Sequence, residues 1–136
     1  MLKVRLVFAW GILASAVAVA LLLSGCASAS PEQAAAAAVQ SYWQAIVDRD
    51  LNQLVELSCS AWEAQARTEF NSFSAVKLQL DNVACQSAGK AGPLVQVTCT
   101  GTILANYGAE DLTIDIAGRT YLVANESGEW RMCGYQ

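Results

Sequence analysis

The sequence predicts an α+β domain in which N-terminal helices pack on a curved antiparallel β-sheet, preceded by a signal peptide. Three observations support this prediction. Helix-capping signals occur between residues 30 and 63, whereas from Phe73 onward apolar residues recur with the period of two that is typical of strands. Residues 1–25 are almost wholly apolar or small. At a total length of 136 residues we expect one globular domain, over residues 31–136.

The composition narrows the classes of function. The chain is 54% hydrophobic and 15% charged, which is too apolar for a disordered protein and too poor in charge for a coiled coil. All 12 acidic residues but only six of the Lys and Arg residues lie beyond residue 25. We therefore expect no nucleic-acid binding, which needs clustered basic side chains, and no electrostatic docking on anionic lipid.

The N-terminus predicts a lipoprotein signal peptide over residues 1–25. Two positive residues, Lys3 and Arg5, precede an apolar stretch of about 18 residues. The following Leu23-Ser24-Gly25-Cys26 resembles the bacterial lipobox, which implies cleavage after Gly25 and transfer of diacylglycerol to the Cys26 sulfur. An uncleaved transmembrane helix is the alternative, because the apolar stretch is just long enough to span a bilayer.

These features predict the location of the protein. We expect residues 26–30 to form a lipidated tether and the lipid on Cys26 to anchor the domain to the cell membrane. The domain would then lie on the extracytoplasmic face, on the periplasmic or extracellular side.

Four further cysteines are expected to form two disulfides in this oxidising compartment. Four cysteines can pair in three ways. The strand pattern favours Cys85–Cys99 together with Cys59–Cys133. The chain has no histidine and no C-x-x-C motif, so we expect neither a metal site nor a cofactor.

Three capping signals predict three helices. Ser30-Pro31-Glu32-Gln33 is a capping box with proline at the first helical position, and this helix should run to about Asp48. Asp50 is expected to cap a short second helix, and Ser60-Ala61-Trp62-Glu63 a third that ends near Asn71. The buried face of the first helix should contain Ala35, Val39, Tyr42 and Ile46.

Period-two patterns predict the strands. Turn residues from Gly89 to Pro93 connect the segments 83–86 and 95–100, and a hairpin about this turn places Cys85 opposite Cys99. Gly118 is expected to interrupt the fourth strand, where a bulge would bend the sheet. The residues expected to be buried on two of the strands are Val95, Val97, Cys99 and Ile103, and Leu112, Ile114 and Ile116.

The order helix, short helix, helix and curved antiparallel sheet resembles the NTF2-like (cystatin-like, SnoaL-like) α+β cone. In the segments that carry this resemblance the chain is similar to small bacterial lipoproteins of this fold, whose role is mostly unassigned. The segments are Tyr42–Ile46, Asp48–Asp50, Leu54–Leu57, Cys99–Gly101, Glu129–Arg131 and Cys133–Tyr135. The resemblance covers residues 31–136 and implies a conical cavity between the first helix and the concave face of the sheet.

This cone is the candidate binding site that the resemblance implies. The side chains expected to line it are Tyr42, Trp43, Ile46, Trp62, Phe73, Tyr121 and Trp130. The same residues also fit the alternative of a filled core, which a domain of this size needs. Two converging arginines would bind a carboxylate, although pairing with surface acids is the simpler interpretation; the candidates are Arg49, Arg67, Arg119 and Arg131.

The sequence shows no catalytic set. Enzymes of this fold, such as ketosteroid isomerase and polyketide cyclases, place an Asp, Glu or His in the cone as general base. Here there is no histidine, and the acidic candidates have structural interpretations as caps, turn residues or solvent-facing residues. These candidates are Asp48, Asp50, Asp81, Glu110, Asp111 and Asp115.

We therefore expect a lipid-anchored envelope protein with a non-enzymatic NTF2-like domain that binds a protein partner or a small apolar ligand. Two alternatives stay open. One is a small isomerase or cyclase that uses a buried carboxylate in the cone. The other is a structural accessory subunit of an envelope complex.

Overall fold

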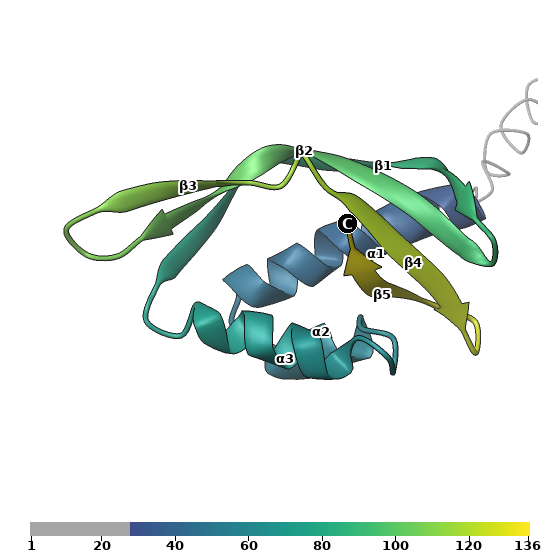
Figure 1. Ribbon diagram of the computed structural model, residues 1–136, viewed down its shortest axis with the longest axis horizontal. Helices are drawn as coiled ribbons and strands as arrows, with labels where there is room; N and C mark the ends of the chain where they lie inside the picture. Colours follow the sequence, from purple (N-terminus) through teal and green to yellow (C-terminus); the bar gives the residue numbers. More distant parts are fainter. Residues whose placement is uncertain (1–27) are drawn as a thin grey trace, which may run out of the picture.

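The computed structural model describes residues 28–136, so the predicted signal peptide and Cys26 lie outside the described residues. It confirms the predicted α+β class, with three helices followed by a curved five-stranded antiparallel sheet (Figure 1). The elements are α1 (Pro31–Val47), α2 (Leu51–Glu56), α3 (Glu63–Ser72), β1 (Lys77–Ala91), β2 (Leu94–Asn106), β3 (Asp111–Asp115), β4 (Thr120–Glu126) and β5 (Glu129–Tyr135). Within residues 28–136, no helix is long and apolar enough to span a membrane.

Helices α1 and α2 begin at the predicted caps. The Ser30 hydroxyl accepts a hydrogen bond from the Gln33 backbone N–H at 3.2 Å, and the Gln33 side chain accepts one from the Ser30 N–H at 2.9 Å. The Asp50 carboxylate accepts from the Gln53 N–H at 3.0 Å and so caps α2. The predicted inner face of α1 is confirmed, because four of its side chains have no exposed surface: Ala35, Val39, Tyr42 and Ile46.

The predicted capping box at Ser60 is wrong. Helix α3 begins three residues later, at Glu63, and its N-cap residue Trp62 makes no side-chain capping bond. The Cys59 backbone N–H donates to the Met132 carbonyl of β5 at 2.9 Å, which holds this segment against the sheet. The Cys59 carbonyl accepts hydrogen bonds from the backbone N–H groups of Trp62 at 2.9 Å and Glu63 at 3.1 Å, so Ser60 lies in a turn before the helix.

The sheet is organised around β2. One side of β2 pairs with β1, and its other side pairs first with β4 and then with β3, while β5 pairs with β4. Cys85 lies opposite Cys99 in the β1–β2 register, as the predicted hairpin requires, and the two form a disulfide. The second disulfide joins Cys59 to Cys133, 74 residues apart, and connects the start of the α3 segment to β5.

The sheet is interrupted at two places. The predicted interruption at Gly118 is found, but it is a connection between the separate strands β3 and β4 on the same side of β2, and the predicted bulge there is wrong. The β1–β2 pairing is irregular between Asp81 and Ala84, where Asn82 has φ +52°. Opposite it, Gly101 has φ +91°, and a Cβ there would lie 2.5 Å from the Asn82 carbonyl oxygen. Only glycine fits this close approach.

Beyond this bend the ends of β2 and β3 extend past the helices (Figure 1). We call residues 102–115 the distal arm. The prediction that Leu112 is buried is wrong, because this side chain is 50% exposed. Ile114 is half-buried and Ile116 is fully buried, so burial rises along the chain toward the helices. The arm has the expected alternation but lacks a helix above Leu112.

Candidate functional site

The narrow part of the cone is filled by its own side chains. Of the seven residues predicted to line it, four have at most 1% of their surface exposed: Tyr42, Trp43, Ile46 and Tyr121. The other three are half-buried beside this core: Trp62, Phe73 and Trp130. The aromatic rings pack edge to face, with Trp43 contacting Tyr42 and Tyr121 at centroid distances of 5.7 and 6.4 Å.

One carboxylate enters this aromatic region, and sequence analysis missed it. Glu69 of α3 accepts hydrogen bonds from the Tyr42 hydroxyl at 2.7 Å and from the Tyr135 hydroxyl at 2.8 Å, one on each oxygen. The Trp62 indole N–H in turn donates to the Tyr42 hydroxyl oxygen at 3.3 Å. A signal existed in the sequence, because Glu69 follows Ala66 by three positions and so lies on the buried face of α3.

The two tyrosines that bind Glu69 stay protonated at neutral pH. Burial, followed by the negative charge of Glu69, raises the pKa of Tyr42 well above its ordinary value. Burial and the hydrogen bond to Glu69 raise the pKa of Tyr135 to about 12. Both hydroxyls are therefore fixed donors, and Glu69 is the fixed acceptor between them.

The predicted arginines have different surroundings. Arg67 forms an exposed ion pair with Glu63 at 2.9 Å. Arg119 lies over the Tyr135 ring, 4.5 Å from its centroid, in a cation–π contact. The Nε of Arg131 is buried without a hydrogen-bond partner among the described residues. Of these four arginines, Arg49 alone lines one of the two pockets described among residues 28–136.

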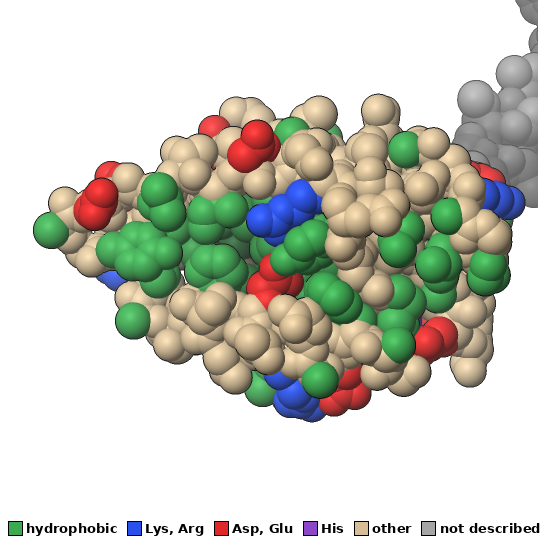
Figure 2. All heavy atoms as spheres, viewed as in Figure 1, with side chains coloured by type: hydrophobic (Ala, Val, Ile, Leu, Met, Phe, Trp, Pro, Cys, Tyr) green, Lys and Arg blue, Asp and Glu red, His purple; other side chains and the backbone are tan. Residues whose placement is uncertain are grey.

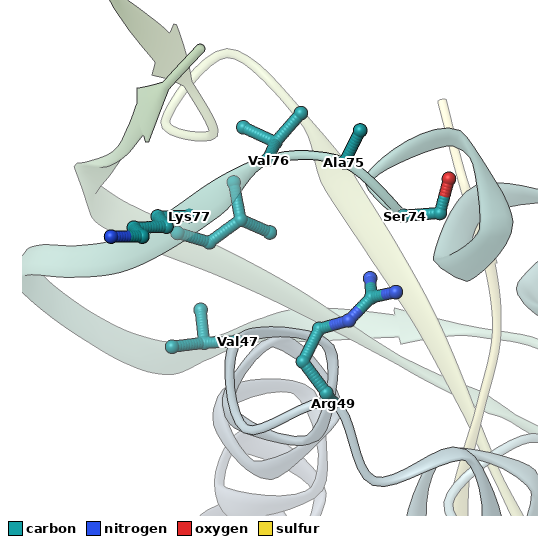
Figure 3. Close-up of a pocket in the computed structure, with 7 residues that line it drawn as sticks. Val47, Arg49, Ser74, Ala75, Val76 and Lys77 are labelled. Atoms are coloured by element: carbon teal, nitrogen blue, oxygen red, sulfur yellow. The ribbon is translucent and has the colours of Figure 1, made fainter. Parts of the chain in front are cut away.

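This pocket has a volume of about 470 Å³ and lies between the end of α1 and the segment that leads from α3 into β1 (Figure 3). It is lined by Val47, Arg49, Ser74, Ala75, Val76, Lys77 and Leu78. In Figure 3 the Arg49 side chain extends from the chain after α1 toward the Ser74 segment. None of the seven predicted lining residues borders this pocket, since the two segments that form it meet only in the folded chain.

Arg49 is held in place by α3. Its φ of +61° is the left-handed conformation that usually belongs to glycine after a helix. The guanidinium donates to the Phe70 carbonyl at 3.3 Å and stacks 4.6 Å from the Phe70 ring centroid. Most of its five N–H donors remain unused by this contact. Among residues 28–136 neither Arg49 nor the neighbouring Lys77 forms an ion pair.

The remaining candidate sites are a second pocket, one group of possible metal ligands and the acidic residues predicted from the sequence. A second pocket, of about 290 Å³, lies between the outer face of α1 and β1 near Gln40 and Gln86. Glu126 lies near Cys59 and Cys133, but their sulfur atoms are used by the disulfide and are poor metal ligands in that form. Five of the six predicted acids accept local hydrogen bonds: Asp48 from Gln44, Asp50 from Gln53, Asp81 from Asn82, Asp111 from Asn106 and Asp115 from Ala117.

No protein-family model and no curated protein matches the chain. Among solved structures it is similar to a SEC-C motif containing protein from Rhodopseudomonas palustris, with TM-score 0.50 and 13% identity over 76% of this chain and 79% of that one. It is also similar to an NTF2-like protein of unknown function from Pseudomonas putida KT2440, with TM-score 0.44 and 13% identity over 73% and 79% of the two chains.

A third similar structure is the helical cell shape determining protein Pgp2 from Campylobacter jejuni, with TM-score 0.49 and 10% identity over 74% of this chain. The chain spans 38% of that protein's length. At such identities a structural likeness concerns the fold alone. Three helices followed by a curved antiparallel sheet confirm the predicted α+β architecture, in the order that the resemblance to NTF2-like proteins implies.

Proposed function

We propose that the protein is a lipid-anchored, non-enzymatic binding domain of the cell envelope. The anchor is proposed from the lipobox at residues 23–26, with the lipid on Cys26 holding the domain at the extracytoplasmic face. Replacement of this cysteine (Cys26→Ser) is expected to leave an unprocessed chain that takes up no radiolabelled fatty acid. Labelling that persists in the variant would contradict the anchor.

The observation that supports binding is the chemistry of the pocket beside α1. Val47, Val76 and Leu78 provide apolar lining, and Arg49 provides N–H donors at its edge. The pocket, of about 470 Å³, is open to solvent, so a small molecule would bind there at the surface of the domain. The ligand class that fits is a small molecule with an apolar body and one anionic group, such as a carboxylate.

Glu69 favours a structural over a catalytic role for the interior of the cone. Both of its oxygens already accept hydrogen bonds from protonated tyrosines. A general base must also lie within reach of a bound substrate, and Glu69 lines neither of the two pockets described among residues 28–136. The alternative of an isomerase or cyclase would have to use this carboxylate, and it predicts that Glu69→Gln abolishes a reaction without weakening the fold.

A calorimetric titration of the full chain in phosphatidylcholine nanodiscs tests the proposal. We expect 3-phenylpropionate to bind saturably, and 3-phenylpropylammonium, which has the same apolar body, to bind at least about tenfold more weakly. Arg49→Gln should weaken binding of the carboxylate about fivefold or more, because the arginine is exposed to solvent.

The matched control is Arg67→Gln, which removes an exposed arginine that is paired with Glu63 and lies outside the pocket lining. The variant Arg67→Gln should bind 3-phenylpropionate with the same affinity as the original chain. Equal binding of the two ligands, or equal losses in the two arginine variants, would refute the proposed site.

A further inference from the structure

The distal arm carries the exposed apolar side chains of the described chain. Leu104, Tyr107 and Leu112 are 39%, 52% and 50% exposed, and among residues 28–136 no other large hydrophobic side chain is exposed to this degree. Figure 2 shows hydrophobic side chains continuing from the arm into a hollow between the arm and the helices below it. Leu112 lies opposite Ala105 on the inner face of the sheet and Leu104 opposite Thr113 on the outer face, so both faces of the arm expose apolar surface.

The arm also presents an open strand edge. β3 pairs with β2 over its whole length, but no strand from residues 28–136 pairs with the other edge of β3. The corresponding edge of β4 is paired with β5. Proteins commonly protect such edges with charged side chains, especially lysine, or with proline or a bulge, and the charged side chains of β3 are the carboxylates of Asp111 and Asp115. Between Asn106 and Gly118 the sequence contains no Lys, Arg or Pro, and the β3 pairing is regular.

The side chains of β3 divide between two faces. Leu112 and Ile114 lie opposite Ala105 and Ile103, which are buried, so they belong to the inner face of the sheet. The outer face is polar and contains two acidic residues, with a third acid, Glu110, just before the strand. The outer-face residues of β3 are Asp111, Thr113 and Asp115.

The negative charges of β3 disfavour two kinds of partner. If β3 paired antiparallel with β3 of a second copy along its whole length, Asp111 would lie opposite Asp115 at both ends, and like charges in that position are destabilising. An anionic membrane is disfavoured by the same carboxylates. The arm also lies at the end of the domain opposite the start of α1 (Figure 1).

We propose that the β3 edge binds an extended segment of a protein partner with the pattern basic, apolar, polar, apolar, basic. Antiparallel addition pairs the free backbone groups of β3 with those of the segment. The two basic side chains lie on the outer face opposite Asp111 and Asp115, and the apolar ones extend the inner face beside Leu112 and Ile114. This site goes beyond the proposed function, because no β3 residue lines the ligand pocket.

The test uses fluorescein-labelled peptides and the full chain in phosphatidylcholine nanodiscs, with empty nanodiscs as the blank. The probe Lys-Val-Thr-Val-Lys should bind about tenfold more tightly than Glu-Val-Thr-Val-Glu in fluorescence anisotropy. The double variant Asp111→Lys, Asp115→Lys should reverse this preference. A lysine peptide N-methylated at its valines cannot complete the strand ladder and should lose binding.

The matched control is the double variant Glu56→Lys, Glu129→Lys, which makes the same change of charge at exposed sites outside the arm. It should keep the preference of the original chain. Three results would each overturn the proposal. They are equal binding of the two peptides, an unchanged preference in the variant Asp111→Lys, Asp115→Lys, and full binding of the N-methylated peptide. Peptide binding at β3 and phenylpropionate binding at the pocket are measured separately, so either proposal can be refuted without the other.

Discussion

Strands β3 and β4 pair with the same side of β2, yet they have different surroundings. In both strands alternate side chains lie on the inner face of the sheet: Leu112 and Ile114 in β3, and Tyr121 and Val123 in β4. In β4, Tyr121 and Val123 are fully buried, whereas in β3 Leu112 is half exposed and Ile114 half-buried. A period of two therefore determines which face a side chain occupies, but the helices determine whether that face is covered.

The half of the sheet that contains β4 is covered by the helices, and we call it the covered half. It forms the structural core of the domain. Its aromatic side chains contact one another, and the carboxylate of Glu69 is bonded to two tyrosines. The half without helices above it has exposed apolar side chains and an open edge. The pocket of Arg49 lies beside it, because Lys77 and Leu78 of the pocket lining belong to the part of β1 that pairs with the end of β2. Stability should therefore depend on the first half and binding on the second.

The largest effect is expected from Trp43→Ala in the covered half. Removing this fully buried ring should lower the free energy of unfolding by about 3–5 kcal/mol, because it leaves a cavity between α1 and Tyr121. Urea denaturation of the full chain in nanodiscs measures the change. A loss below about 1 kcal/mol would mean that the cone is loosely filled, and would restore it as a candidate ligand cavity.

A glycine pair tests the bend that separates the two halves. Gly101→Ala should cost about 3 kcal/mol, because the new Cβ meets the Asn82 carbonyl in a left-handed conformation. Gly108→Ala in the turn of the arm has a similar φ of +95° but no atom within 4 Å, so it should cost about 1 kcal/mol. Equal losses in denaturation would show that the close approach at Gly101 has no energetic effect.

The Glu69 cluster predicts an alkaline limit for the covered half. The pKa of Tyr135 is raised from 10.0 to about 12 in the folded chain, so folding favours the protonated hydroxyl. Its contribution is fully present below about pH 10 and is lost as the pH rises toward 12. Tyr135→Phe should cost about 1 kcal/mol at pH 7 and weaken this alkaline loss in thermal unfolding measured from pH 8 to 12. An unchanged pH profile would contradict the cluster.

The smallest effect is expected from Leu112→Ala in the arm. Half of this side chain is exposed, so its truncation should change the free energy of unfolding by no more than about 0.5 kcal/mol. The same substitution should weaken binding of the lysine peptide to the β3 edge. A loss of stability close to that of Trp43→Ala would mean that the arm is covered in solution.

The comparison also explains what the sequence could predict. Three predicted features that depend only on neighbouring residues or on one hairpin are found in the structure. They are the cap at Ser30, the buried face of α1 and the register of Cys85 with Cys99. The start of α3 was missed because a distant strand, through Met132, holds Cys59. The exposure of Leu112 depends on where the helices end, which no periodicity within β3 encodes.

The site was harder to predict for the same reason. The seven side chains chosen as cavity lining are those that best fill a core, and hydrophobicity alone does not distinguish these roles. The pocket joins Val47 at the end of one helix to Leu78 at the start of a strand. Glu69 could have been found from its place on the buried face of α3, where an acid requires hydrogen-bond partners.

Methyl NMR of the full chain in nanodiscs with added 3-phenylpropionate tests most directly whether binding occurs outside the filled cone. We expect saturable shifts at Val47, Val76 and Leu78, which line the pocket, and none at Ile46 or Val123, which are fully buried in the core. Shifts confined to Ile46 and Val123 would contradict this account and place the ligand inside the cone.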